Sequence, residues 1–203
     1  MTSLFPVAAG DTTDLVTADL ADDLIDVGSS LDTGQTSYLK FTKTGNWVFG
    51  RDDNEVDPEE LIAVNPTSFT IGWKGWNNGT PVSGPIVPIK QRKTLPKEDE
   101  LEVLPAGEMN GWSKVLGVSL QSMADGTPLQ YDATSYHGKE AVTKLMKEIG
   151  LGLKEHAEAP VALVKLTGDK YKHKTYGSDV HYPVFTIVGW ADGEGKEVKK
   201  LAA

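Results

Sequence analysis

Glycine, proline and asparagine interrupt the apolar segments of this chain so often that few of these segments are long enough for a helix. The 203 residues include 21 glycines and 11 prolines, and many of these separate short apolar runs. Short alternating runs bounded by turn residues are typical of strands. The pattern therefore predicts a mainly β (β-rich α+β) protein, with strands at 38–41, 47–49, 61–64, 68–73, 112–123, 129–134, 161–166 and 184–190.

The residues between these runs indicate how neighbouring strands are joined. Tight turns are predicted at Thr44-Gly45-Asn46, Asn77-Asn78-Gly79 and Asp125-Gly126. The first of them makes 38–49 a hairpin. Segment 82–89 contains two prolines, which restrict it to an edge strand or a loop. The charged segment 91–102 is expected to be exposed.

One segment has helical instead of alternating periodicity. Its apolar residues fall on one helix face: Ala141, Val142, Leu145, Met146 and Ile149. Gly150 and Gly152 are expected to end this helix. The order from 112 onward is then strand, strand, helix, strand, strand. With the hairpin ahead of it, this order predicts an elaborated oligonucleotide-binding (OB)-like β-barrel, with one main helix before the last two strands. A β-sandwich with one helix fits the same strands.

Charge and composition divide the chain into two parts. Residues 1–60 hold 13 acidic and 3 basic residues, whereas residues 61–203 hold 16 acidic and 17 basic residues. We expect residues 1–36 to form an acidic N-terminal arm, flexible or a short helix, and 37–203 to form a single domain. The absence of cysteine and of any long apolar segment suggests a cytoplasmic protein without a membrane anchor.

A segment between the last two predicted strands alternates cations with aromatic rings. Its residues are Lys170, Tyr171, Lys172, His173, Lys174 and Tyr176. Lysines neutralise phosphates, and tyrosine rings stack on unpaired bases. The segment is therefore a candidate nucleic-acid loop whose rings and charges would share one concave face. The competing interpretation is an exposed hairpin with solvated lysines.

A second group combines aromatic residues with nearby cations. It comprises Trp73, Lys74, Trp76, Lys40, Lys43 and Arg51. The two indoles that flank Lys74 could bind a base or a partner's side chain, or they could fill the core. Trp112 and Trp190 are expected in the core.

No catalytic motif is evident in the sequence. The acidic residues of 52–60 do not follow a calcium-loop pattern, and no nucleophile elbow, phosphate-binding loop or dinucleotide fingerprint occurs. We therefore expect a binding protein instead of an enzyme, with no cofactor and no metal. A nuclease that uses Asp52, Asp53 and Glu55 with a divalent ion is the third possibility.

Parts of the chain resemble a group of small tailed-bacteriophage proteins, over about residues 38–190. The residues that carry the resemblance are Tyr38 to Phe41, Gly45, Trp47, Phe49-Gly50, Asn65-Pro66, Gly72-Trp73, Pro160-Val161, Leu166, Tyr171 to Lys174, Tyr176-Gly177 and Pro183 to Phe185. The group is associated with phage DNA replication and recombination, where single-stranded DNA-binding proteins are common. The resemblance implies a single-stranded DNA-binding protein in the host cytoplasm. The acidic arm would contact phage or host replication proteins, and a homo-oligomer is an open possibility.

The alternative function is that of a phage structural protein or a host-protein interaction protein that does not bind nucleic acid. The acidic arm and the tryptophans would then serve a protein interface.

Overall fold

The computed structural model describes residues 37–105, 111–155, 157–192 and 197–200. The chain divides into two units, Met1–Gln35 and Thr36–Ala203, and all of the described residues belong to the second. The predicted acidic arm at 1–36 lies outside the described residues.

Strands make up most of the regular structure in the described part of the chain, so the predicted mainly β class is confirmed. They are β1 (Ser37–Phe41), β2 (Trp47–Phe49), β3 (Asn54–Glu55), β4 (Ile62–Val64), β5 (Thr70–Asn77), β6 (Thr80–Pro88), β7 (Gly111–Ser122), β8 (Pro128–Ala133), β9 (Val161–Lys172), β10 (Asp179–Ala191) and β11 (Glu197–Lys200). The helices are the short 3-10 segments η1 (Ile89–Thr94) and η2 (Glu98–Glu100), and the α-helix α2 (Tyr136–Glu155).

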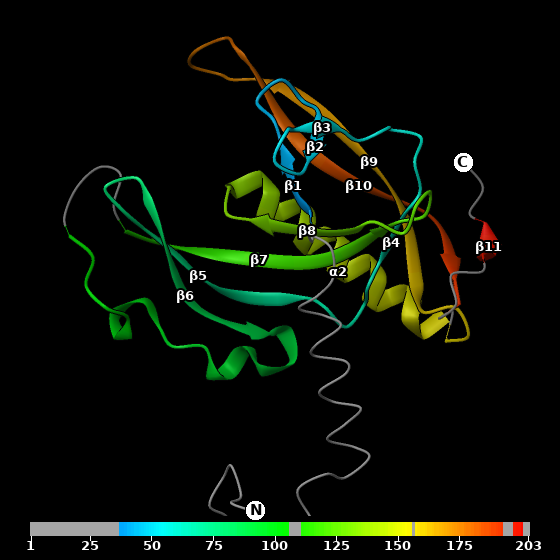
Figure 1. Cartoon of the computed structure of the whole chain (residues 1–203), viewed down its shortest axis with the longest axis horizontal. Coiled ribbons are helices and arrows are strands. Elements are labelled where there is room, and N and C mark those ends of the chain that lie inside the picture. Colours follow the sequence, from blue (N-terminus) through cyan, green and yellow to red (C-terminus); the bar gives the residue numbers. More distant parts are fainter. Residues whose placement is uncertain (1–36, 106–110, 156, 193–196, 201–203) are drawn as a thin grey trace, which may run out of the picture. The chain divides into compact units, whose positions relative to one another are not determined.

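The described strands form one strongly curled sheet, in the order β11-β10-β9-β4-β7-β8-β1-β2-β3 (Figure 1). Neighbouring strands are antiparallel except β1 and β8, which are parallel. The long strand β7 organises the sheet because β8 pairs along one edge, while β5 and β4 pair in turn along the other. β6 pairs with β5, and the structure records no second partner for β6 among the described strands. This agrees with the predicted edge strand.

The predicted turns are confirmed, and each uses residues that tolerate a positive φ. Gly45, at the turn between β1 and β2, has φ +94°. Asn78 and Gly79 have φ values of 50° and 76° and link β5 to β6 as a two-residue turn. Such turns match the twist of the flanking strands, so both hairpins form as their sequences predict.

The core closes where the two ends of the curled sheet approach each other. Trp47 on β2 is buried, and its ring lies 5.0 Å from that of Tyr131 on β8 and 5.2 Å from that of Phe185 on β10. Its indole Nε1–H donates to the carbonyl oxygen of Thr167 on β9, at 2.7 Å. Burial also raises the pKa of Tyr131 to about 12. One indole therefore joins the first hairpin to the last.

The helix does not end at its glycines, which corrects the prediction for Gly150 and Gly152. α2 continues through both to Glu155. Gly152 is buried because the ring of Trp190 packs directly on its backbone, and a Cβ there would collide with that ring. A tertiary contact therefore explains Gly152, where sequence patterns suggested a helix terminus.

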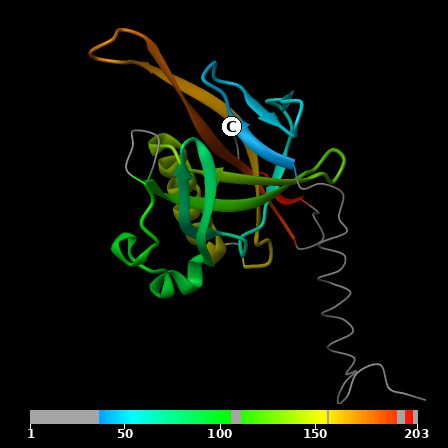
Figure 2. The same ribbon diagram turned by 60° about the vertical axis from the view of Figure 1, so that its left-hand side comes forward.

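The last two strands are longer than predicted. They run from Val161 to Lys172 and from Asp179 to Ala191, and their outer halves extend beyond the neighbouring strands (Figures 1 and 2). A further strand, β11, pairs with β10 at residues 189–191 and was not predicted. The pairing register continues out to Lys172 and Asp179, which apolar patterning alone would not indicate because these outer residues are polar.

The two helix glycines supply a matched test of this packing. We expect Gly150→Ala to stabilise the protein by about 0.5–1 kcal/mol, because Gly150 is exposed and alanine favours the helix. Gly152→Ala should instead destabilise it by about 1–3 kcal/mol, because the added methyl group must displace Trp190. Urea unfolding measures both changes, and equal effects at the two positions would contradict the packing described here.

Candidate functional site

The predicted nucleic-acid loop is mostly strand. Lys170, Tyr171 and Lys172 belong to β9, so only His173, Lys174 and Tyr176 of the predicted residues lie in the connecting turn. The structure thus corrects the expectation of a loop from residue 167 onward. Gly168 lies within the strand, and it passes so close to the ring of Phe41 and the carbonyl of Gly45 that a side chain would not fit there.

The lysines and the tyrosine of β9 lie on opposite faces of the hairpin. Lys172 pairs across the strands with Asp179, and Lys170 pairs with His181. Tyr171 lies between the two lysines, and successive side chains of a strand point to opposite sides. The expectation that these rings and charges share one face is therefore wrong for Tyr171. It holds for the two lysines.

Both of these lysines share one carboxylate. The Nζ atoms of Lys170 and Lys172 lie 3.0 Å and 2.9 Å from the two carboxylate oxygens of Asp179. Hydrogen bonds from Lys172 and then Lys170 lower the pKa of Asp179 to about 2. Two positive charges are thus held side by side with one negative charge between them, which leaves a net positive face.

The turn at the tip of the hairpin is built around His173. Its backbone N–H donates to Ser178 and its carbonyl accepts from Gly177, both at 2.8 Å. Its Nδ1 accepts the backbone N–H of Thr175 and of Tyr176, at 3.2 Å and 3.3 Å. The imidazole stacks on the ring of Tyr176, with centroids 4.8 Å apart and planes inclined by 28°. Tyr176 is nevertheless 79% exposed, so a large part of its ring remains open to solvent.

The turn between β1 and β2 packs against the same hairpin. The Cα of Gly45 lies so close to the imidazole of His181 that a Cβ there would collide with it, and Gly168 packs on the Gly45 carbonyl. Lys43 is an exposed residue of this turn. We call the resulting area the hairpin surface, which comprises Lys43, Lys170, Lys172, His173, Lys174, Tyr176 and His181.

Trp73, Lys74 and Trp76 are not part of the hairpin surface, because they lie on β5, which pairs with β6 and β7. Trp73 is buried, which corrects its place among the candidate binding residues and agrees with the alternative that it fills the core. Its indole N–H donates to the carbonyl of Pro96 at 2.9 Å, within the segment that follows β6. Trp76 and Lys74 are half-buried. Of the two indoles, that of Trp73 is therefore covered by protein, and that of Trp76 is partly open to solvent.

The remaining predicted cations lie near the start of the domain. Lys40 on β1 forms an ion pair with Asp53 at 2.7 Å. Arg51 is exposed and lies between β2 and β3. Trp112 is half-buried instead of lying in the core, whereas Trp190 is buried as expected.

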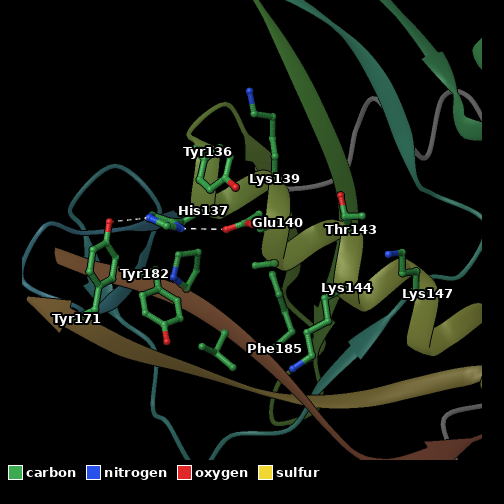
Figure 3. A pocket seen from close by; sticks show the side chains of 13 residues that line it. Tyr136, His137, Lys139, Glu140, Thr143, Lys144, Lys147, Tyr171, Tyr182 and Phe185 are labelled. Carbon is green, nitrogen blue, oxygen red and sulfur yellow. Dashed lines mark hydrogen bonds and ion pairs between the residues drawn. The ribbon is translucent and has the colours of Figure 1, made fainter. Parts of the chain in front are cut away.

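Sequence reasoning missed a groove between α2 and β10, of about 780 Å³ (Figure 3). At one end His137 contacts three tyrosines, with ring centroids 5.1 Å from Tyr136, 5.5 Å from Tyr171 and 5.6 Å from Tyr182. The two nitrogens of His137 lie 3.1 Å from the Tyr171 hydroxyl and 3.1 Å from a Glu140 carboxylate oxygen. The adjacent Tyr136-His137 at the helix start was the available signal.

Hydrogen bonds in this aromatic group also affect its titration. Glu140 raises the pKa of Tyr136 through a hydrogen bond to the phenol. The Tyr182 hydroxyl donates to Asp169 at 2.8 Å, and this hydrogen bond raises the pKa of Tyr182. The pKa of Asp169 is lowered, mainly by a hydrogen bond from the Lys170 backbone and also by the one from Tyr182. Tyr136 and Tyr182 therefore keep their phenol protons to a higher pH than a tyrosine in water does.

Within the described ranges, no three His, Asp or Glu side chains are grouped so that they could hold a metal ion. Asp53 is engaged by Lys40, and Glu55 accepts a hydrogen bond from Asn46. Among the helices that the structure describes, none is both long and apolar enough to cross a membrane.

Comparison of the chain with protein families, curated proteins and solved structures gave no match. The resemblance to phage proteins therefore remains a prediction.

The shared carboxylate on the hairpin surface predicts an unusual titration. Asp179 should remain ionised until the pH approaches about 2. Because its pKa is lowered on folding, the interaction stabilises the fold above about pH 3.8 and is lost as the pH falls through about 2. Carboxyl carbon chemical shifts followed by NMR measure this pKa.

The variants that test this titration differ only in which lysine is removed. Lys172→Ala should raise the pKa of Asp179 most, because the Lys172 hydrogen bond contributes most to its lowering. Lys174→Ala should leave that pKa unchanged, because Lys174 has no part in the pairing. An Asp179 that titrates near 3.8 in the unaltered protein would contradict the ion pairs described here.

Proposed function

We propose that this protein binds single-stranded DNA through the hairpin surface. The observation that carries the proposal is the packing of Gly45 on His181, which brings the turn with Lys43 to the cationic face of the last hairpin. In this proposal, four lysines from two distant parts of the sequence border one surface: Lys43, Lys170, Lys172 and Lys174.

The charges of the surface suit a flexible anionic strand. Lys170 and Lys172 are exposed and hold one acid between them, and Lys43 and Lys174 are exposed at its two ends. Lysines that neutralise phosphates release condensed counterions, which supports binding despite the net charge of −9 for the whole chain.

The tip of the hairpin adds a stacking platform. Tyr176 is held against His173, so its orientation is fixed before a ligand arrives. An exposed, oriented ring can stack on an unpaired base, and such contacts contribute roughly 1–3 kcal/mol each. The backbone hydrogen bonds to His173 Nδ1 help to keep this arrangement in place.

The proposal includes an OB-like relationship for the curled sheet. In OB barrels the loops after the first and fourth strands bind oligonucleotides. Here the turn of the first hairpin meets the last long hairpin, an arrangement of the same kind. A phage replication or recombination role in the host cytoplasm belongs to the same proposal, as do replication proteins as partners of the acidic N-terminal segment and a homo-oligomeric state.

Fluorescence anisotropy with a labelled oligothymidylate tests the proposal. Tyr176→Ala should weaken binding by roughly fivefold to a hundredfold, because a stacking contact is lost. Lys174→Ala should reduce the slope of log affinity against log salt by about one phosphate contact. Tyr38→Ala and Lys154→Ala are matched controls, since both alter exposed residues outside the hairpin surface.

A gain of affinity provides a sharper test. Asp179→Asn removes the acid between Lys170 and Lys172 and should tighten DNA binding severalfold at low salt, with the gain shrinking as salt rises. No binding by the unaltered protein at low salt, or an Asp179→Asn variant that binds more weakly, would exclude the hairpin surface as a DNA site.

The alternative function, interaction with a protein, is favoured by one separate feature: the groove between α2 and the free edge of β10.

A further inference from the structure

The outer part of β10 is an unpaired sheet edge. One side of β10 pairs with β9 along its length. On the other side β11 pairs only with residues 189–191, and no further strand neighbour is recorded there among the described residues. An unpaired edge presents backbone N–H and C=O groups that can pair with another chain.

Pro183 indicates which backbone groups face outward. It pairs in register with Gly168 on β9 but has no N–H to donate, so its nitrogen must face away from β9. Backbone groups alternate in direction along a strand, so those of His181 and Phe185 also face away from β9. Two N–H donors and three carbonyl acceptors are therefore directed toward the side on which β10 has no strand neighbour at these positions in the described part of the chain.

The groove lies along this edge. Its β10 lining is the consecutive run 182–185, which includes residues of both strand faces. A groove that touches both faces of a strand must follow its edge. A second hollow, of about 420 Å³, continues along α2 toward Trp190 and shares Lys144 and Phe185 with the first. Together they follow β10 over a length that would hold roughly six to eight extended residues.

The helix side of the first hollow is cationic. Lys139, Lys144 and Lys147 line it, and its one acidic residue, Glu140, is engaged by His137. Besides the shared Lys144, the second hollow is lined by Glu148 and Glu155, so the cationic lining is confined to the first. Figure 3 shows Lys144 extending from α2 toward β10. No ion pair is recorded for Lys139 or Lys147 within the described residues, and that of Lys144 with Glu148 is exposed, at 3.8 Å. These charges complement carboxylates on an occupant.

The apolar part of the lining offers anchor sites. Phe185 and Val184 line the groove from β10, and Tyr136, which is 68% exposed, lines it from the start of α2. Alternate side chains of an added strand would point toward such pockets, and its backbone would pair with the edge.

We propose that this groove binds an extended, acidic segment of a partner protein, which adds to β10 as a further strand. This interaction is separate from the proposed DNA binding, because no residue of the hairpin surface is among those that line the groove. Lys170 and Lys172 also lie on the opposite face of β9 from Tyr171, which does line it.

The test uses the full chain and a fluorescent ten-residue peptide that alternates glutamate with valine and carries one phenylalanine. Hydrogen exchange followed by NMR should show that this peptide protects the amide of Phe185, which lines the groove, and that of His181, the other donor that faces away from β9. A peptide with N-methyl groups on alternate residues should not bind, because it cannot pair with the edge. The same peptide with lysine in place of every glutamate should bind more weakly.

Charge-reversal variants test whether the lysines of the groove contribute to peptide binding. Lys144→Glu combined with Lys147→Glu should weaken peptide binding by about tenfold or more, because like charges then face each other. Lys154→Glu with Lys90→Glu is the matched control, since it makes the same change of charge at exposed lysines outside the groove lining, and it should leave affinity unchanged. Tyr176→Ala should also leave it unchanged, so a failure of DNA binding does not affect this result.

Several outcomes would overturn the proposal. They are no binding at about millimolar peptide, equal binding of the N-methylated peptide, or binding that leaves His181 and Phe185 unprotected. Protection by an oligonucleotide of the Phe185 amide, which lies outside the hairpin surface, would assign the groove to nucleic acid. Protection without any ligand, together with a dimer by light scattering, would assign it to a second copy of the chain.

Discussion

The arrangement of the curled sheet depends on the indole of Trp47. The strands β2 and β10 lie far apart in the strand order, yet Trp47 contacts Phe185 and donates a hydrogen bond to Thr167. A large buried ring with a satisfied N–H supplies both apolar contact and a directional bond. The ring of Phe41 against Gly168 and the packing of Gly45 on His181 add further contacts between the first hairpin and the last.

The candidate sites follow from that closure. Because the first hairpin is held against β9, Gly45 reaches His181 and places Lys43 beside the last hairpin. Among the described residues, the outer half of β10 has no second strand neighbour, while α2 lies alongside it. One face of the β9–β10 hairpin therefore carries lysines, and its free edge borders a groove. The hairpin surface and the lining of the groove have no residue in common.

Local sequence was sufficient for the strands and turns near glycine and asparagine. The pairs at Gly45 and at Asn78-Gly79 could be predicted because a positive φ is a property of those residues themselves. The mainly β class could be predicted because turn residues separate short apolar runs throughout the sequence, and this too is a local property. The N-terminal segment of 1–36 and its predicted role lie outside what the structure describes.

The tertiary structure decided the faces, the edges and the exposure of the rings. The sequence places Lys170, Tyr171 and Lys172 together, but strand alternation separates the tyrosine from the lysines. It also cannot show that Pro96 covers Trp73, or that Trp190 occupies the space beside Gly152. Each of these contacts joins residues far apart in the chain. Local residue preferences therefore determined which segments form strands and turns, and only long-range packing determined which side chains remain available to a ligand.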